Sequence, residues 1–482
     1  MDDLVRALLA ESAAIGRTPL DRPTPAPPER RVSPRELIER LDAQLDPQQR
    51  NFLEALVAAV RPSGDAQSLL PTPPPSIHEG GFRIYPTPSE PAFGNCGVTD
   101  PPCSTHYVGV PGHFGALAYL RGTRGTPRRL LIAVHGSDLP GWRTHPARAM
   151  YGRAATLADH IWGDDYAIVA PALQRTAFKP YSLLTPWVWY WSGGWGYGNR
   201  PARFNPCHFL IESAGLSCAE AEQQQIPGEL PIGGYTGRPS SFEVLDELIR
   251  QELALLGASL EYVCLVGHSH GGQAVQRYAL LDRGVSDEVL RATGRPLRYV
   301  AMNAGAYAYL IAKRWITPPA RPINCRPAIA DNPEPAFWTI PVCEGYDDWP
   351  LGLSNAEQAE QSGVPLEAAR RFAIARYGLR EDASLRTALA HNFAHKDVHV
   401  LQSALDRAPG PGATCGPQQQ GCSRLERMRL FRESLLIDTP DELHEATVAV
   451  VRNCRVIDAA HPHSSATMFR AAAVRDIISG RG

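Results

Sequence analysis

The sequence has no run of about 18 apolar residues, so it predicts no membrane-spanning helix. Its formal net charge is -2, and no long stretch carries charges of one sign. This pattern gives no support for a nucleic-acid partner or for binding to an anionic membrane. At 482 residues, the chain can bury a large core, either as one elaborated domain or as two or three domains.

Metal-ligand spacings of the C-x2-C or H-x3-H kind are missing beside the cysteines, which argues against a zinc site there. Eight of the ten cysteines lie in loop-like sequence as neighbours along the chain: Cys96 and Cys103, Cys207 and Cys218, Cys325 and Cys343, and Cys415 and Cys422. Such pairs predict disulfides and an oxidising compartment, so we expect a secreted or periplasmic protein. The opening residues lack the basic and apolar regions of a signal peptide, which leaves a cytoplasmic protein with free thiols as the alternative.

One stretch, Glu261–Gly272, leads apolar residues into a Gly-x-Ser-x-Gly turn, and helix-forming residues follow it. This order of strand, sharp turn and helix is the context of a nucleophile elbow. Such a turn strains the backbone of its middle residue, and Gly267 and Gly271 leave room where a Cβ would collide. We therefore predict that Ser269 is a catalytic nucleophile at a helix N-terminus, where the dipole favours negative charge. The alternative is an incidental serine in a glycine-flanked turn.

Apolar runs typical of buried strands alternate with helix-forming segments through most of the chain. Strands are expected at Arg128–Val134, Asp165–Pro171, Leu297–Asn303, Val398–Gln402 and Arg455–Ile457, besides the one before Ser269, with helices at Arg153–Ile161 and Glu243–Leu256. This alternation predicts an α/β fold with a mostly parallel central sheet and helices on both faces. Proline-rich links predict an N-terminal helical appendage over residues 1–75, followed by a catalytic domain over 76–482. Insertions are expected at about 174–240, as an aromatic lid, and at about 313–395, as a cap.

A serine nucleophile needs a base within hydrogen-bond reach, and the base needs a carboxylate partner. For the base we choose His463, which follows the last predicted strand, with His461 as the alternative. For the acid we choose Asp406, in the loop beyond the carboxyl end of a strand, where open α/β sheets assemble their sites. Asp397 lies at the other end of that strand. The remaining candidates are weaker: His391, His395, His399 and His444 for the base, and Asp438, Asp441 and Asp458 for the acid.

An oxyanion site requires two backbone donors near the nucleophile. The N–H of His270 is the first candidate, and Gly136 or Ser137, directly after a predicted strand, supplies the second. The insertion at 174–240 holds an unusual cluster of aromatic residues among glycines. We predict that these aromatic residues form a pocket wall that binds substrate: Trp187, Trp189, Tyr190, Trp191 and Trp195. The alternative is a packed aromatic cluster beneath a loop.

The chain resembles serine hydrolases of the α/β-hydrolase superfamily, and is similar to a fungal and bacterial group with a GHSxGGQ elbow. The matching segments are Ser240–Asp246, Gly267–Gln273, Gln276–Ala279, Arg298–Tyr309, Cys343–Trp349, Lys396–Leu401 with Asp406, Cys415 with Gln420, Gly421 and Arg424, and His463 with Met468 and Phe469. The resemblance implies the α/β-hydrolase fold and a triad of Ser269, Asp406 and His463. The group differs in having a small residue at position 270 and a glycine where Gln402 or Ser403 stands.

Together these features predict a carboxylic-ester hydrolase that works through an acyl-enzyme and needs no metal or organic cofactor. The aromatic segment favours a hydrophobic or aromatic acyl or alcohol part in a small or polymeric ester. An amidase or peptidase would use the same three residues, and a non-catalytic binding module could keep the same fold. The sequence leaves the oligomeric state open.

Overall fold

The computed structural model describes residues 102–111, 113, 117–136, 146–173, 191, 194–201, 239–316, 337–339, 345–407 and 419–481. The predicted appendage at 1–75 lies outside these residues, as do most of the insertion at 174–240 and the middle of the one at 313–395. The division of the chain into those parts therefore stays a prediction. In the described part, no helix is long and apolar enough to cross a membrane.

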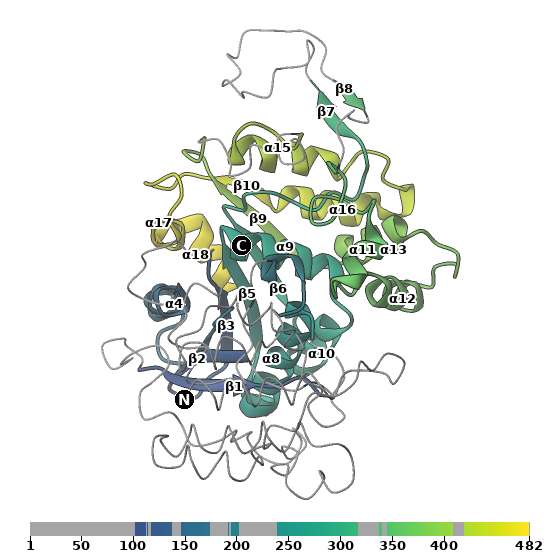
Figure 1. Ribbon diagram of the computed structural model, residues 1–482. Helices are drawn as coiled ribbons and strands as arrows, with labels where there is room; N and C mark the ends of the chain where they lie inside the picture. Colours follow the sequence, from purple (N-terminus) through teal and green to yellow (C-terminus); the bar gives the residue numbers. More distant parts are fainter. Residues whose placement is uncertain are drawn as a thin grey trace, which may run out of the picture.

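A twisted sheet of eight strands runs through the centre of the described region (Figure 1). In spatial order its strands are β1 (Ser104–Val108), β2 (Leu117–Arg124), β4 (Tyr166–Pro171), β3 (Arg129–Val134), β5 (Tyr262–His268), β6 (Arg298–Met302), β9 (Asp397–Ser403) and β10 (Cys454–Ile457). The β1–β2 and β2–β4 pairs are antiparallel, and all the other pairs are parallel. This arrangement confirms the prediction of a mostly parallel sheet.

The central strands are apolar throughout because both of their faces are covered. All seven residues of β5 are buried, and alternate side chains enter two different cores. Val263 and Leu265 pack on one face, whereas Cys264 and Val266 pack on the other. The continuous apolar runs in the sequence thus reflect two separate cores, one on each side of the sheet.

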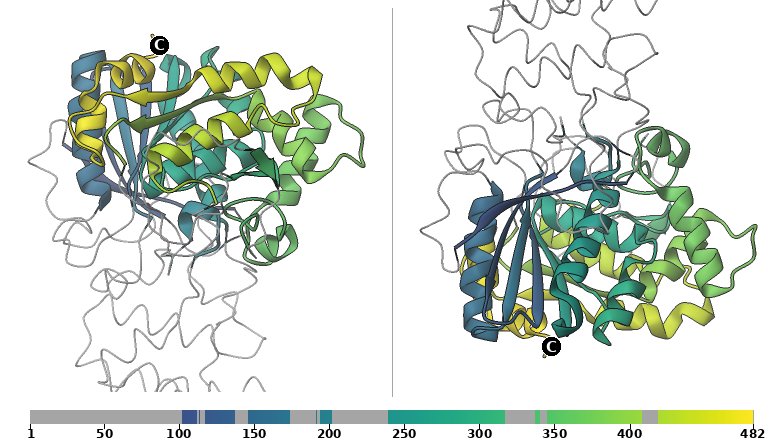
Figure 2. Two further views of the ribbon diagram at one scale, coloured as in Figure 1. Left: turned by 90° about the horizontal axis from the view of Figure 1, so that it is seen from above. Right: turned by 90° about the horizontal axis from the view of Figure 1, so that it is seen from below.

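Helices cover both faces of the sheet, as predicted (Figure 2). One face carries α4 (Pro146–Trp162), α17 (Ser465–Arg470) and α18 (Ala472–Ser479). The other carries α8 (Ser241–Leu256), α9 (His270–Leu281), α10 (Val285–Thr293), α13 (Leu385–Ala394), α15 (Arg424–Ser434) and α16 (His444–Arg452). Beside this layer lie α11 (Ala356–Gln361) and α12 (Leu366–Tyr377), and β7 (Arg314–Ile316) pairs with β8 (Phe337–Thr339) in a separate ribbon. Since α13 packs against α9 and leads into β9, the last part of the predicted cap belongs to the helical layer.

The parallel register brings the carboxyl ends of four strands to one edge of the sheet. His268 pairs with Met302, Met302 pairs with Leu401, and Ser403 pairs with Ile457. The loops that follow β5, β6, β9 and β10 therefore emerge side by side. Residues from these loops form the candidate site, although they lie far apart in the sequence.

The cysteines of the described region fall into two classes. Cys264 and Cys454 are buried free thiols, and burial raises the pKa of each to about 12. Cys103 and Cys422, in contrast, each take part in a disulfide. The other cysteines of the four predicted pairs lie outside the described residues, so the pairing itself stays a prediction.

Candidate active site

Ser269 lies at the sharp turn between β5 and α9, with φ 59° and ψ -117°. Such positive φ values are strained for a residue with a side chain, and this strain is often found at functional sites. The backbone N–H of Ser269 donates to Met302 O at 2.9 Å, which ties the turn to the end of β6. The half-buried Ser269 is thereby held at the tip of the turn, at the N-terminus of α9.

Glycines allow the first turn of α9 to sit directly against the strands. A Cβ on Gly267 would lie inside 3.0 Å of backbone atoms of Gly271 and Gly272. A Cβ on Gly272 would meet the carbonyl oxygen of Met302 at 2.5 Å. The Gly-rich pattern around Ser269 thus reflects a close approach of backbone to backbone, as the sequence predicts for an elbow.

We expect Gly271→Ala to lower the free energy of unfolding by about 1–3 kcal/mol, the usual range for extra atoms forced into a close-packed region. The new Cβ would lie inside 3.0 Å of the carbonyl oxygens of Val134 and His135, and strand backbone cannot readily withdraw. Thermal unfolding followed by circular dichroism measures the change. Wild type is the reference, because at Gly163, where a Cβ would meet no atom within 4 Å, the φ of 69° would itself strain an alanine. A midpoint for Gly271→Ala no lower than that of wild type would contradict the close packing.

The imidazole of His463 faces Ser269 from the loop between β10 and α17. Its Nε2 lies 3.0 Å from Ser269 Oγ. Ser464 caps α17 by accepting from the N–H of Thr467 at 3.5 Å, which helps fix the loop. His461 is exposed, and its Nδ1 accepts a hydrogen bond from the backbone N–H of His463 at 3.3 Å. Of the two histidines considered for the base, His463 is therefore the one that the structure brings to Ser269.

Asp406 completes this arrangement from the turn after β9. Its Oδ2 lies 2.8 Å from Nδ1 of His463, and its side chain is fully buried. Gln402 Nε2 donates to the same oxygen at 2.8 Å, and Arg424 Nη1 donates to Oδ1 at 3.1 Å. Because the carboxylate only accepts here, the proton of the neutral imidazole lies on Nδ1 and leaves Nε2 to accept from Ser269. Asp397, at the start of β9, pairs instead with Arg298 and His399 at the opposite end of the strand.

A second imidazole, His268, packs beside His463, with ring centroids 5.0 Å apart. Burial lowers the pKa of His268 well below its ordinary value, and the nearby His463, Arg153 and Arg424 act in the same direction. His268 is therefore neutral at pH 7, and its Nε2 accepts from Asn303 Nδ2 at 3.3 Å. A neutral neighbour of this kind supports the ring of His463 without repelling a proton on it.

Two of the three residues predicted for an oxyanion site are described. His270 is the first residue of α9, so its N–H belongs to the helix N-terminus next to Ser269. Gly136 lies beside Ser269, because a Cβ there would be 3.9 Å from Ser269 Oγ and 3.4 Å from Ser269 Cβ. Ser137 lies outside the described residues.

The predicted aromatic wall is described only at its far end. Three of its members lie outside the described residues: Trp187, Trp189 and Tyr190. Trp191 and Trp195 have exposed fractions of 0% and 1% and belong to the core on the α9 side. The ring of Trp195 lies edge-on to His270, with centroids 4.5 Å apart, and 5.1 Å from the ring of His135. These two tryptophans are therefore core residues of the described region, and a role of the aromatic segment in substrate binding stays a prediction.

A short 3-10 turn, η2 (Trp195–Tyr197), holds these rings against α9. Arg277 of α9 donates to Gly196 O at 3.3 Å and to Pro350 O at 3.0 Å, and its guanidinium lies 4.9 Å from the Tyr197 ring centroid. Burial lowers the pKa of Arg277 to about 10. Trp349 Nε1 adds a hydrogen bond to Tyr197 O at 2.7 Å. The turn is thus fixed to the same helix that begins at His270.

Sequence reasoning did not single out Asn303, Gln402 or Arg277 for a role at the site. Asn303 and Gln402 are polar residues at the carboxyl ends of apolar strands, and that position was an available signal. Arg277 lies in the middle of a helix, where a charged residue ordinarily indicates an exposed face. Its side chain is fully buried, which only the tertiary structure reveals.

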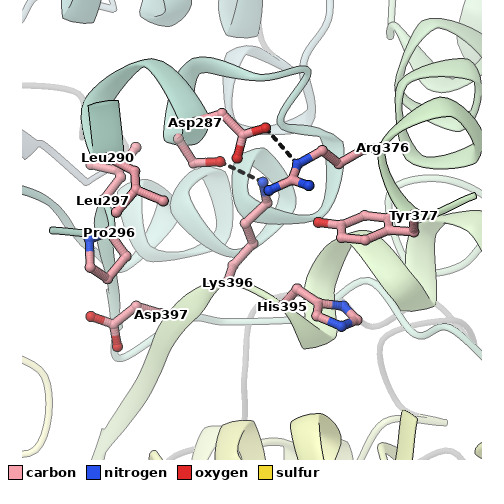
Figure 3. A pocket seen from close by; sticks show the side chains of 10 residues that line it. Asp287, Leu290, Pro296, Leu297, Arg376, Tyr377, His395, Lys396 and Asp397 are labelled. Atoms are coloured by element: carbon pink, nitrogen blue, oxygen red, sulfur yellow. Dashed lines mark hydrogen bonds and ion pairs between the residues drawn. The ribbon is translucent and has the colours of Figure 1, made fainter. Parts of the chain in front are cut away.

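One cavity of about 290 Å³ lies at the other end of the sheet, where β6 and β9 begin (Figure 3). Two basic residues that line it are already paired: Arg376 Nε donates to Asp287 Oδ2 at 2.7 Å, and Lys396 Nζ donates to Asp282 Oδ2 at 2.7 Å. The side chain of His395 stacks on Tyr377. This cavity is separate from Ser269, which lies beyond the opposite ends of the strands. Within the described part of the chain, no three His, Cys, Asp or Glu side chains are grouped as metal ligands.

Neither a protein-family model nor a curated protein matches the sequence. Several solved structures, however, are similar to this chain. Poly(aspartic acid) hydrolase-1 from Sphingomonas sp. KT-1 is 17% identical, with a TM-score of 0.40 over 78% of this chain and 98% of that one. LpqC, a poly(3-hydroxybutyrate) depolymerase from Bordetella parapertussis, is 16% identical, with a TM-score of 0.41 over 79% of this chain and 91% of that one. The Wnt deacylase Notum from Drosophila is 10% identical, with a TM-score of 0.30 over 78% of this chain and 87% of that one.

The fold itself follows from the strand order, the two antiparallel pairs at one edge, the helices on both faces and the strained serine after β5. The chain adopts the α/β-hydrolase fold.

Proposed function

We propose that this protein is a serine hydrolase that cleaves carboxylic esters through an acyl-enzyme. One observation supports this most directly: His463 bridges Ser269 and Asp406, at 3.0 Å from the hydroxyl and 2.8 Å from the carboxylate. A base within hydrogen-bond reach of a hydroxyl, itself oriented by a buried acid, is the arrangement that activates a serine. A binding module would need neither of these two contacts.

In the first half of the reaction, Ser269 Oγ attacks the ester carbonyl carbon and its proton passes to His463 Nε2. The carbonyl oxygen becomes an oxyanion, which the N–H of His270 and a second N–H from Gly136 or Ser137 stabilise. Asp406 accepts from Nδ1 and stabilises the imidazolium. The intermediate then collapses, the bond from carbon to the alkoxy oxygen breaks, and His463 returns the proton to the departing alcohol.

In the second half, a water molecule takes the place of the alcohol. His463 Nε2 accepts a proton from this water, whose oxygen attacks the acyl carbon. The second oxyanion collapses, the bond to Ser269 Oγ breaks, and the serine recovers its proton from His463. The products are a carboxylic acid and an alcohol, and the enzyme returns to its starting state without a cofactor.

An ester is an easier substrate than an amide for this arrangement of residues. An alkoxide leaves more readily than an amide nitrogen, which must be protonated as the bond breaks. Support for a hydrophobic or aromatic substrate comes from the aromatic residues next to the oxyanion side. The half-buried Tyr197 has its ring 5.2 Å from that of His270, and the ring of the buried Trp195 lies 4.5 Å from it. We propose that Trp187, Trp189 and Tyr190, of the predicted aromatic wall, bind the substrate.

We also propose that the protein acts in an oxidising compartment, secreted or periplasmic. Disulfides persist in such compartments and are rare where glutathione keeps thiols reduced. The disulfide-bonded state of Cys103 and Cys422 supports this placement.

Asp406→Asn tests the mechanism at the acid. We expect kcat for a p-nitrophenyl ester to fall by about 10⁴-fold, because an amide donor favours the wrong tautomer of His463. Asp397→Asn is a matched control, since Asp397 also lies within 3.0 Å of a histidine, His399, but at the other end of β9. The control should keep kcat within about twofold, the range expected of a change far from the site. An equal loss in both variants would show that Asp406 has no special part in the chemistry.

The bond type is settled with the wild-type protein on a matched pair of substrates, a p-nitrophenyl ester and a p-nitroanilide of the same acid. We expect the ester to be hydrolysed with the higher kcat/KM. Faster hydrolysis of the anilide would replace the esterase assignment with an amidase. Absence of both activities, together with no reaction with a fluorophosphonate probe, would refute the proposed function.

A further inference from the structure

Asn303 follows β6 and has a backbone φ of 48°, one of the few positive values at a residue other than glycine. Asparagine adopts this left-handed conformation more readily than most residues, yet glycine would adopt it without strain. The residue is completely buried. A buried polar side chain on a strained backbone needs compensating contacts, and Asn303 has them on every side.

The amide oxygen of Asn303 contacts the loop that carries Asp406. It accepts from the backbone N–H of Ser403 at 2.9 Å and from Gln402 Nε2 at 3.2 Å. A backbone N–H can only donate, so this contact fixes which end of the Asn303 amide is the oxygen. Gln402 Nε2 also donates to Asp406 Oδ2 at 2.8 Å, the oxygen that His463 shares.

The amide nitrogen of Asn303 contacts the residues that precede the nucleophile and the base. It donates to Nε2 of His268 at 3.3 Å and to the carbonyl oxygen of Pro462 at 3.5 Å. His268 accepts because its burial keeps it neutral. One side chain thus touches the residue before Ser269, the residue before His463, and the glutamine that holds Asp406.

The backbone of Asn303 adds a further connection, since its N–H donates to Leu401 O at 2.8 Å. Completely satisfied polar networks in a buried site are rigid, because any displacement leaves a donor or acceptor unpaired. Misplacement of a catalytic group by about 1 Å can cost a factor of about 100 in rate. A shared anchor for the three loops would prevent such misplacement.

We propose that Asn303 is a positioning residue that sets the relative placement of Ser269, His463 and Asp406, an inference that rests on the proposed function. It contacts none of the reacting atoms. Its effect passes through His268, Pro462 and Gln402, one to each member of the triad. The strained backbone places the amide where it reaches all three at once.

Asn303→Gly tests this role, because glycine keeps the positive φ without strain and removes only the side chain. We expect kcat for a p-nitrophenyl ester to fall by about 100-fold, with KM within about twofold of wild type. A residue needed only for folding would lower the amount of active protein, and its removal would leave the kcat of each labelled active site unchanged. Titration of active sites with a fluorophosphonate probe separates these cases.

Asn392→Ala is the matched control. Asn392 is also completely buried, and its Nδ2 donates to the carbonyl oxygens of Leu280 and Asp282 at 3.0 Å and 2.8 Å. It lies in α13, where alanine suits the helix. We expect lower thermal stability but an unchanged kcat per active site. Loss of kcat in Asn392→Ala equal to that in Asn303→Gly would assign the effect to general loosening and overturn the proposal.

Gln402→Met provides a second test if Asn303→Gly does not fold. Methionine has a similar length and no amide, so it removes the link from Asn303 to Asp406, together with a long hydrogen bond of 3.4 Å that Gln402 Oε1 accepts from the Tyr307 hydroxyl. We expect kcat to fall by about 10-fold at unchanged KM, less than the full effect of a 1 Å misplacement. A folded variant of either kind with wild-type kcat would overturn the inference. Because wild type would still hydrolyse the ester, that result would leave the proposed function standing.

Discussion

Ser269→Ala should lower kcat for ester hydrolysis by about six orders of magnitude, the size of loss expected when a serine nucleophile is removed. The methyl group cannot attack a carbonyl carbon, and the strained turn at φ 59° holds no other hydroxyl in its place. A fluorophosphonate probe, which reacts with an activated serine, should label wild type and leave the variant unlabelled. Activity on a p-nitrophenyl ester and mass spectrometry of the labelled peptide give the two readouts.

Ser259→Ala is the control for this experiment. Ser259 ends the short 3-10 turn η3 (Gly257–Ser259) before β5, and its hydroxyl donates to backbone carbonyls of Pro127 and Leu256. It therefore probes the loss of a serine hydroxyl at the opposite end of the strand that leads to Ser269. Ester hydrolysis by Ser269→Ala at the wild-type rate would remove the basis of the enzyme assignment.

His463→Ala should cost about as much as the loss of the nucleophile, about 10⁶-fold in kcat, because the members of a triad act as a unit. Without the imidazole, Ser269 loses the base at 3.0 Å, and the carboxylate of Asp406 keeps Gln402 and Arg424 as partners. The stability of the fold should change little, because the imidazole lies partly exposed at the surface of the site. Circular dichroism and the p-nitrophenyl assay measure the two effects.

His461→Ala distinguishes the two histidines of this loop. His461 accepts the N–H of His463 through its ring and is otherwise exposed, so its removal should lower kcat by less than about 10-fold, as expected for one surface hydrogen bond. The reverse result, with His461→Ala inactive and His463→Ala active, would require the loop to adopt another arrangement in solution.

The fold was accessible from the sequence because the sheet is covered on both faces. β3 and β5 are short, mainly apolar runs, and helix-forming segments come after them, so their length and order along the chain predict strands. The elbow was also accessible, because glycines at 267 and 271 satisfy a steric requirement that few other residues meet.

Other parts of the site depend on contacts that the sequence does not encode locally. That Asp406 lies near His463 follows from the parallel pairing of β9 with β10, which places their loops together. The partners Gln402 and Asn303 come from two strands about a hundred residues apart. Buried arginines such as Arg277 look like ordinary surface charges in a one-dimensional pattern. Long-range polar contacts of this kind require the folded structure.

The way in which Arg277 joins η2, α9 and the Pro350 loop has a consequence for enzyme engineering. Redesign of the substrate pocket commonly exchanges a surface loop while the catalytic scaffold is kept. Here Arg277 joins the segment from Trp195 to Tyr197 to α9, the helix that begins at His270, which we propose as an oxyanion donor. A chimaera that imports a foreign loop should therefore retain these three residues together with Arg277, so that the exchange alters selectivity and leaves catalytic competence intact.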